Sequence, residues 1–161
     1  MALGRAINWF QKFWSTDNES MYSHAGIILN EHGDTFESLW KIRRASLAAY
    51  EGDQVIIGQI GTVPGLHIND AIRYLIRMHN GQIYPFWRLP MAMLKPLSKY
   101  IAFANHPMCS ELTAKYLKLA GVPGIGLWSG KTPDDIADMI RKWDAFEVIF
   151  EGRFSMDMLE T

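Results

Sequence analysis

Strand-like and helix-like segments occupy separate blocks of this chain, and that order sets its fold class. Strand patterns dominate residues 22–60, whereas helix patterns dominate residues 69–143. Chains grouped in this way fold as α+β domains, in which helices pack against an antiparallel sheet. The 161 residues, of which 48% are hydrophobic, suffice for one well-packed core. We therefore predict a single α+β domain spanning residues 1–161.

Strands are predicted over residues 22–29, 35–40, 54–60 and 146–150. The turn residues 31–34 would join the first two strands as a hairpin. Residues 41–50 are ambiguous and fit the end of a strand followed by one helical turn. The tail from Ser155 is expected to be loose.

Helices are predicted over residues 2–14, 69–78, 89–104, 108–120 and 132–143, with Pro96 splitting the third. Asn69 is expected to cap the second helix, and Gly121 to end the fourth. Thr132 and Pro133 form a strong helix start, since a hydroxyl cap and a first-turn proline are followed by two acidic residues.

The chain contains one cysteine, Cys109, at the expected start of a helix. Together with Leu112, Tyr116 and Leu119 it falls on one helical face, at the edge of an apolar stripe. The free N–H groups and the positive dipole at that end would stabilise a thiolate or an oxyanion. A buried cysteine that acts as a small hydrophobic residue is the alternative interpretation.

A nucleophilic cysteine needs a base, and the base needs a partner that orients it. His24 is the best placed of the five histidines, because a strand holds a side chain more rigidly than a turn does. Glu37 lies among apolar residues of the partner strand, where an unpaired buried carboxylate would be costly. A suitable hairpin register would bring Glu37 within reach of the His24 imidazole. In the alternative, Glu37 points to solvent and His24 bonds a carbonyl group.

Several short motifs, taken in order, resemble the circularly permuted, NlpC-type branch of the papain-like cysteine hydrolases. They are Tyr22-Ser23-His24-Ala25-Gly26-Ile27, Phe36-Glu37, Gly81-Gln82-Ile83-Tyr84, Cys109-Ser110-Glu111-Leu112 and the helix start Thr132-Pro133-Asp134-Asp135. In that branch the histidine strand precedes the cysteine helix, which reverses the order in papain. The similarity covers residues 22–140.

The resemblance implies that Cys109 is the nucleophile, His24 the general base and Glu37 the third, polar residue. It also implies a permuted papain-like fold, with a small antiparallel sheet packed on the helix that carries the cysteine. The shared chemistry is attack on an acyl carbon through a thioester, so the expected partner is a peptide or acyl substrate. Tyr22 and Ser110 are further candidates for oxyanion donors or rim residues.

Three substrates or roles stay open at this point. A peptide or isopeptide amide is our first choice, with peptidoglycan stem peptides as the leading example. An acyltransferase or a lipid or ester hydrolase could use the same triad. A binding module could also keep the fold without turnover, and it would then have an ordinary thiol at Cys109.

Other site chemistries find less support, and we expect neither a cofactor nor a metal. His24, His32, Glu37 and Cys109 could surround zinc, but no metal-ligand spacing supports that site. The run Gly130–Thr132 lacks the glycine that a phosphate-binding P-loop requires, and we interpret it as a connector at the rim of the site. The sequence contains no Gly-x-Ser-x-Gly motif, which argues against a serine hydrolase.

Charge and hydropathy restrict the partners and the compartment. Sixteen basic residues against seventeen acidic ones argue against a nucleic-acid partner held by phosphate contacts. No apolar run is long enough to span a membrane, although Trp9, Phe13 and Lys12 would also suit a first helix lying at a membrane interface. The first residues lack the pattern of a signal peptide, which predicts a cytoplasmic protein.

Overall fold

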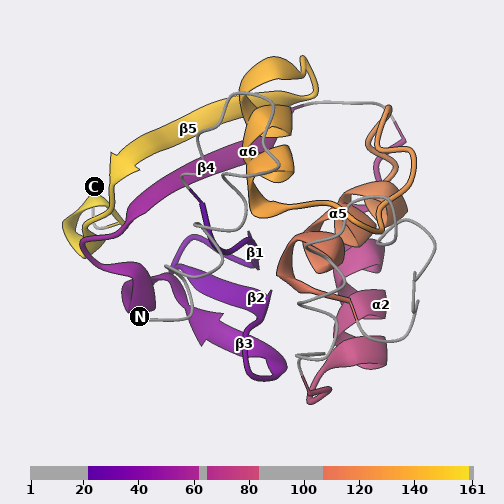
Figure 1. Ribbon diagram of the computed structural model, residues 1–161, viewed down its shortest axis with the longest axis horizontal. Coiled ribbons are helices and arrows are strands. Elements are labelled where there is room, and N and C mark those ends of the chain that lie inside the picture. Colours follow the sequence, from indigo (N-terminus) through magenta and orange to yellow (C-terminus); the bar gives the residue numbers. More distant parts are fainter. Residues whose placement is uncertain (1–21, 62–64, 84–106, 160–161) are drawn as a thin grey trace.

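The computed structural model describes residues 22–61, 65–83 and 107–159. Within these ranges the chain forms an α+β arrangement with two small antiparallel sheets and three α-helices, as Figure 1 shows. The predicted α+β class is therefore confirmed. The helices predicted over residues 2–14 and 89–104 lie outside the described residues.

The first sheet has three antiparallel strands in the order β1 (Gly26–Ile28), β2 (Asp34–Ser38) and β3 (Ile42–Ser46). A short 3-10 helix, η1 (Leu47–Tyr50), follows β3 directly. The strands β4 (Gln54–Ile60) and β5 (Phe146–Arg153) form a separate two-stranded ribbon. The helices are α2 (Ile68–His79), α5 (Cys109–Ala120) and α6 (Pro133–Lys142), and the 3-10 helix η3 (Met156–Leu159) ends the described part.

The strands follow the sequence prediction in place but not in length. The ambiguous residues 41–50 form a complete strand and a helical turn. The first strand is shorter than predicted, because β1 pairs with β2 only from Gly26↔Glu37 to Ile28↔Thr35, so His24 lies just before the strand and not within it. The last strand is longer, because β5 pairs with β4 from Ile60↔Phe146 to Gln54↔Arg153.

The helix ends test the capping predictions directly. Thr132 Oγ1 accepts a hydrogen bond from Asp135 N at 3.1 Å, and Gly121 ends α5 in the left-handed region at a φ of 89°, so both predictions are confirmed. The prediction for Asn69 is wrong, since α2 begins at Ile68 with His67 at the cap position and no side-chain cap.

The tail beyond Ser155 is held more firmly than predicted. Phe154 is buried, and its N–H bonds to Asp53 O at 2.9 Å. The N–H of Met156 bonds to the Glu51 carboxylate at 2.7 Å, and one turn of 3-10 helix follows. The tail is therefore fixed to the turn between η1 and β4.

The core lies between the three-stranded sheet and the helices. Phe36 and Ile42 from the sheet meet Leu75 of α2 and Leu112 of α5, and all four side chains are almost fully buried. Helix α5 is buried on more sides than a single stripe predicts, although Leu119, expected on that stripe, is exposed. This helix contacts β1, β2, α2 and α6. Figure 1 shows it beside α2.

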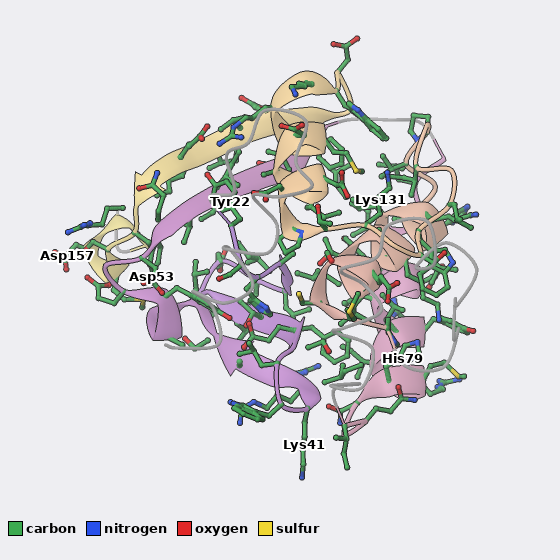
Figure 2. All side chains as sticks on the ribbon, in the orientation of Figure 1. Tyr22, Lys41, Asp53, His79, Lys131 and Asp157 are labelled. Carbon is green, nitrogen blue, oxygen red and sulfur yellow. The ribbon has the colours of Figure 1, made fainter. Side chains whose placement is uncertain are left out.

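Two close contacts hold the outer elements in place. A Cβ atom at Gly58 would lie 2.5 Å from a side-chain carbon of Ile140, so α6 approaches β4 where only a glycine fits. On the other side, His79 of α2, labelled in Figure 2, has Nε2 2.9 Å from the amino group of Lys115 on α5. Its Nδ1 lies 2.9 Å from Gln82 Oε1, so the ring is held between two helices and the following turn.

Candidate active site

The hairpin register places His24 and Glu37 on one face of the sheet. Gly26 is opposite Glu37, and side chains alternate along a strand, so the side chain two residues before Gly26 points toward Glu37. His24 Nε2 lies 2.9 Å from Glu37 Oε2. The Glu37 side chain is only 2% exposed, so it does not point to solvent. Its carboxylate meets the imidazole in a largely buried setting.

Tyr50 is a fourth member of this cluster that the sequence did not suggest. Its hydroxyl donates a 2.5 Å hydrogen bond to Glu37 Oε2, the oxygen that His24 also contacts. Its ring stacks on the His24 ring, with centroids 5.7 Å apart and planes inclined by 11°. Ser46 Oγ accepts a hydrogen bond from Ala48 N and starts the η1 turn that carries Tyr50. Ser46, as a possible cap before the ambiguous residues 47–50, was the one feature of the sequence that could have indicated this turn and so the position of Tyr50.

Cys109 begins α5 and is buried beside His24. The thiol and the imidazole are close enough that each shifts the pKa of the other toward the charged form. Because Glu37 occupies Nε2, the nitrogen left for the thiol is Nδ1. The backbone N–H groups of Ala25 and Ser110 also act on the sulfur and lower its pKa. Strand β1 and helix α5 are packed together, and their contact brings the two residues into reach.

These contacts favour the charged forms of all three side chains. Burial alone would lower the pKa of His24, but the hydrogen bonds with Cys109 and Glu37 outweigh it and raise the pKa to about 9. Burial alone would raise the pKa of Cys109, but the His24 hydrogen bond and charge hold it below its ordinary value. The pKa of Glu37 is likewise lowered against its burial by hydrogen bonds from His24 and Tyr50. The arrangement suits a thiolate and an imidazolium held by a carboxylate.

Glu111 joins the start of α5 to the Gly-rich connector before α6. Its buried carboxylate accepts from Met108 N at 3.0 Å through Oε2 and from Gly130 N at 2.8 Å through Oε1. Ser110 Oγ donates to Lys131 O at 2.5 Å. The connector therefore lies against the first turn of α5, next to Cys109. Ser110 offers its backbone N–H to the sulfur, but its hydroxyl is bonded to this connector.

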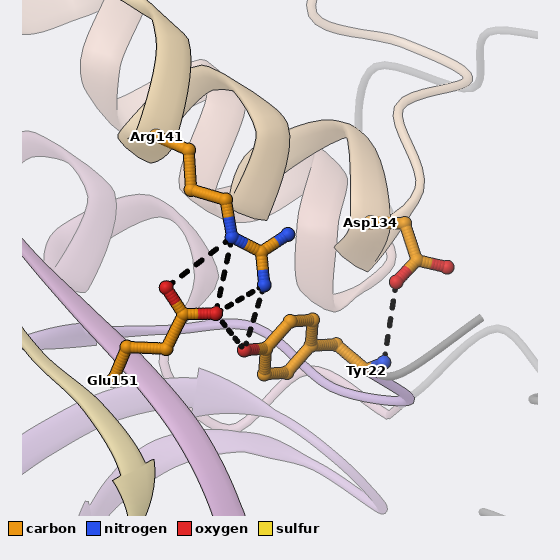
Figure 3. A network of polar contacts seen from close by, with 4 residues as sticks. All are labelled: Tyr22, Asp134, Arg141 and Glu151. Carbon is orange, nitrogen blue, oxygen red and sulfur yellow. Dashed lines mark hydrogen bonds and ion pairs between the residues drawn. The ribbon is translucent and has the colours of Figure 1, made fainter. Parts of the chain in front are cut away.

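Tyr22 lies in a different network, drawn in Figure 3. Its hydroxyl contacts Glu151 Oε1 of β5 at 3.4 Å and accepts from Arg141 Nη2 of α6 at 3.2 Å. Arg141 also pairs with Glu151, and the N–H of Tyr22 bonds to Asp134 Oδ1 at 3.2 Å. The structure thus brings Cys109, His24 and Glu37 together, whereas the Tyr22 side chain fastens the start of β1 to the ribbon and α6.

Two wider features concern metals and membranes. In the described ranges, no three histidine, cysteine, aspartate or glutamate side chains gather closely enough to hold a metal ion. Among the helices of the same ranges, none combines the length and apolar character needed to cross a bilayer.

Comparison with known proteins does not identify the chain by similarity. No protein-family model matches it, and no curated protein or solved structure gives a significant match. The function must therefore be inferred from the geometry of Cys109, His24 and Glu37.

Proposed function

We propose that this chain is a cysteine hydrolase of the circularly permuted, NlpC-type papain-like kind, which cleaves an amide or isopeptide bond through a thioester. The observation that carries the proposal is the placement of the Cys109 thiol next to the His24 imidazole, whose Nε2 lies 2.9 Å from Glu37 Oε2. The arrangement supplies a nucleophile, a base and an orienting carboxylate in the order that nucleophilic catalysis requires.

The expected reaction has two halves. The Cys109 proton moves to His24, and the thiolate attacks the carbonyl carbon of the substrate. The C–N bond then breaks as the His24 imidazolium protonates the leaving amine, which leaves the acyl group on sulfur as a thioester. Water attacks that thioester after giving a proton to His24, and the carboxylic acid leaves as the thiol is restored.

The start of α5 supplies groups for the oxyanion formed in each half. The first N–H groups of a helix have no partner within the helix, and the positive end of the dipole favours negative charge there. The backbone N–H of Cys109 is the first of these groups, and we propose it as one oxyanion donor.

The arrangement of elements supports the permuted papain-like fold as part of the proposal. The strand that follows His24 precedes the helix that begins at Cys109 in the chain, and both strands of the hairpin contact that helix. The family that the sequence motifs resemble has the same order of elements, and its sheet packs on the helix that carries the cysteine. A peptidoglycan stem peptide is the leading substrate.

The first experiment measures the rate of Cys109 alkylation by iodoacetamide against pH. Because the chain has one cysteine, every modified thiol is Cys109. We expect an apparent pKa below that of a free thiol, and a shift back toward it in His24→Ala. His32→Ala is the matched control, because this exposed turn histidine has no contact with the thiol. If the apparent pKa of Cys109 is not lowered and does not change in His24→Ala, the catalytic assignment fails, and a binding module becomes the better interpretation.

The second experiment seeks the substrate. Purified stem peptides with an isopeptide cross-link, and an acyl ester, are each incubated with the protein and with Cys109→Ala. The proposal is supported if the wild type hydrolyses the peptide and Cys109→Ala does not. It is also supported by an acyl group bound to Cys109, seen as a mass increase that hydroxylamine removes. Glu37→Gln should retain part of the activity, because it keeps the shape and loses the charge. Cleavage of the ester alone, or transfer of its acyl group to an amine or alcohol, would replace the proposed hydrolase by an acyltransferase or lipid hydrolase.

A further inference from the structure

A cleft separate from Cys109 lies between the three-stranded sheet and α2. Its volume is about 260 Å³, somewhat below the range of roughly 300–1,000 Å³ typical of sites for drug-sized ligands. The sheet contributes Leu29, Asn30, Asp34 and Arg44, and the helix contributes Asn69, Ile72, Arg73 and Ile76. The size suits a small molecule.

The cleft combines an apolar floor with polar edges. Leu29, Ile72 and Ile76 are half-buried and pack against the hydrophobic core, so they form the floor. Arg44 and Arg73 are exposed and come from opposite walls. Such a mixture binds a ligand with an apolar part and a charged end.

The charges of the two arginines are not paired with other side chains in the described part of the chain. Within the described part of the chain, the side chains of Arg44 and Arg73 take part in neither a hydrogen bond nor an ion pair. The cleft contains one carboxylate, that of Asp34, which accepts a 2.8 Å hydrogen bond from Asn30 Nδ2. Two guanidinium groups against one carboxylate leave the cleft positive, and guanidinium matches the geometry of a carboxylate or phosphate.

Hydrogen bonds within the turn hold the sheet wall of the cleft. Asn30 Oδ1 accepts hydrogen bonds from His32 N and Asp34 N, each at 3.1 Å, and these bonds fix the turn between β1 and β2. Leu29 N also bonds to Asp34 O at 2.7 Å. A site whose wall is already ordered loses less entropy on binding.

The cleft and the candidate active site use opposite faces of the sheet. Arg44 is paired with Phe36, which points into the core, whereas Arg43 is paired with Glu37. Side chains of adjacent residues point to opposite faces of a strand. A ligand in the cleft therefore would not touch Glu37 or His24 from that side.

We propose that this cleft binds a small amphiphilic oxyanion, an alkyl phosphate or alkyl carboxylate, with its anionic end between Arg44 and Arg73 and its chain over Leu29, Ile72 and Ile76. The proposal does not depend on the hydrolase function, because it uses none of the groups around Cys109.

The test uses the full chain, n-hexyl phosphate as the probe, and amide chemical shifts as the readout. We expect saturable shifts at Leu29, Asn30, Ile72 and Ile76 at millimolar concentration. Arg44→Gln and Arg73→Gln should each weaken binding by about tenfold or more, since each removes a charge-assisted hydrogen bond. Arg77→Gln is the matched control, because Arg77 is exposed on the same helix and does not line the cleft.

A ligand series tests the apolar floor without changing the protein. Hexyl phosphate should bind several-fold more tightly than inorganic phosphate, because its chain is withdrawn from water. Hexanol should bind weakly, since it lacks the charge. Equal affinity for inorganic and hexyl phosphate, equal affinity for hexanol, or unchanged binding in the Arg44→Gln/Arg73→Gln double variant would each overturn the proposal.

Two further measurements locate the ligand and its source. Binding must persist in Cys109→Ala, and shifts concentrated around Cys109 would assign the probe to the candidate active site and overturn the proposal. Co-sedimentation with phosphatidic acid vesicles that is lost in the double variant would identify a lipid surface as the source of the anion. Binding of the soluble probe alone would identify a free metabolite, and either result supports the cleft.

Discussion

Glu37 Oε2 receives hydrogen bonds from both His24 and Tyr50, so one carboxylate oxygen orients two rings that also stack on each other. The pKa of Tyr50 is raised, first by burial and then by the bond to Glu37, so its hydroxyl remains a donor. The carboxylate is thereby fixed in position as well as kept in its charged form. At the scale of single residues, the imidazole depends on Tyr50 as well as on Glu37.

Tyr50→Phe tests that dependence. The variant keeps the ring that stacks on His24 and removes one hydrogen bond to a charged group. We expect the free energy of unfolding to fall by about 1.5–3 kcal/mol, and the pKa of Glu37 to rise toward its ordinary value. Carboxyl NMR titration and urea unfolding measure the two effects. Tyr74→Phe, at an exposed site on α2, is the control, and identical results for both variants would show that the shared oxygen has no energetic role.

The pKa of His24 should also set the highest pH at which the protein is active. The leaving amine needs a proton from the imidazolium, so the hydrolysis rate should fall as pH rises through about 9, the raised pKa of His24. Alkylation of the thiolate needs no such proton and should not decline there. Parallel pH profiles of hydrolysis and alkylation measure the difference. A decline in both at the same pH would assign the upper limit to the thiol or to loss of the fold.

At the scale of elements, the side chains of Glu111 and Ser110 join the first turn of α5 to the connector before α6. Glu111 accepts hydrogen bonds from Met108 N and Gly130 N with separate oxygens. Glutamine offers one acceptor oxygen and would leave one of these buried N–H groups without its acceptor. The position of the connector next to Cys109 therefore depends on a carboxylate.

Glu111→Gln should lower the free energy of unfolding by about 1–3 kcal/mol and loosen the connector. Hydrogen exchange of the Gly130 amide should become faster, and urea unfolding gives the change in stability. Glu147→Gln is the control, since Glu147 is an exposed residue of β5. Unchanged exchange at Gly130 would mean that the rest of the connector holds it without Glu111.

The unfolding free energy of the whole molecule should depend on pH through the same cluster. The lowered pKa of Glu37 contributes stability that is fully present above its unfolded value of 4.5 and is lost as pH falls through the folded value. The raised pKa of His24 contributes stability that is fully present below 6.5 and is lost as pH rises through about 9. The contribution of Glu37 and His24 together is therefore largest between pH 4.5 and 6.5.

Urea unfolding across this range, for the wild type and for a His24→Gln/Glu37→Gln double variant, measures that contribution. The difference between the two proteins should be greatest in the stated window and should shrink on both sides. Glu31→Gln, at an exposed turn position, serves as the control. A difference that stays constant with pH would mean that the cluster stabilises the fold by packing rather than by charge.

The sequence predicted what depends on neighbouring residues. The hairpin, the Thr132 cap and the end of α5 at Gly121 follow from local patterns, and the alternation of the strands made the approach of Glu37 to His24 foreseeable. Tyr50 was missed because its contact with Glu37 requires the exact path of a short helical turn after β3. Local pattern could not name the partner of β4 either, because β5 comes late in the chain.

The pairing of β4 with β5 has a consequence for the growing polypeptide on the ribosome. Residues 54–60 must remain without their partner until residues 146–153 have been synthesised, whereas the segments carrying His24, Glu37 and Cys109 are all made earlier. Contacts between distant segments form late in folding. The ribbon, and with it the bond from the Tyr22 hydroxyl to Glu151, therefore closes only after those three segments have been made.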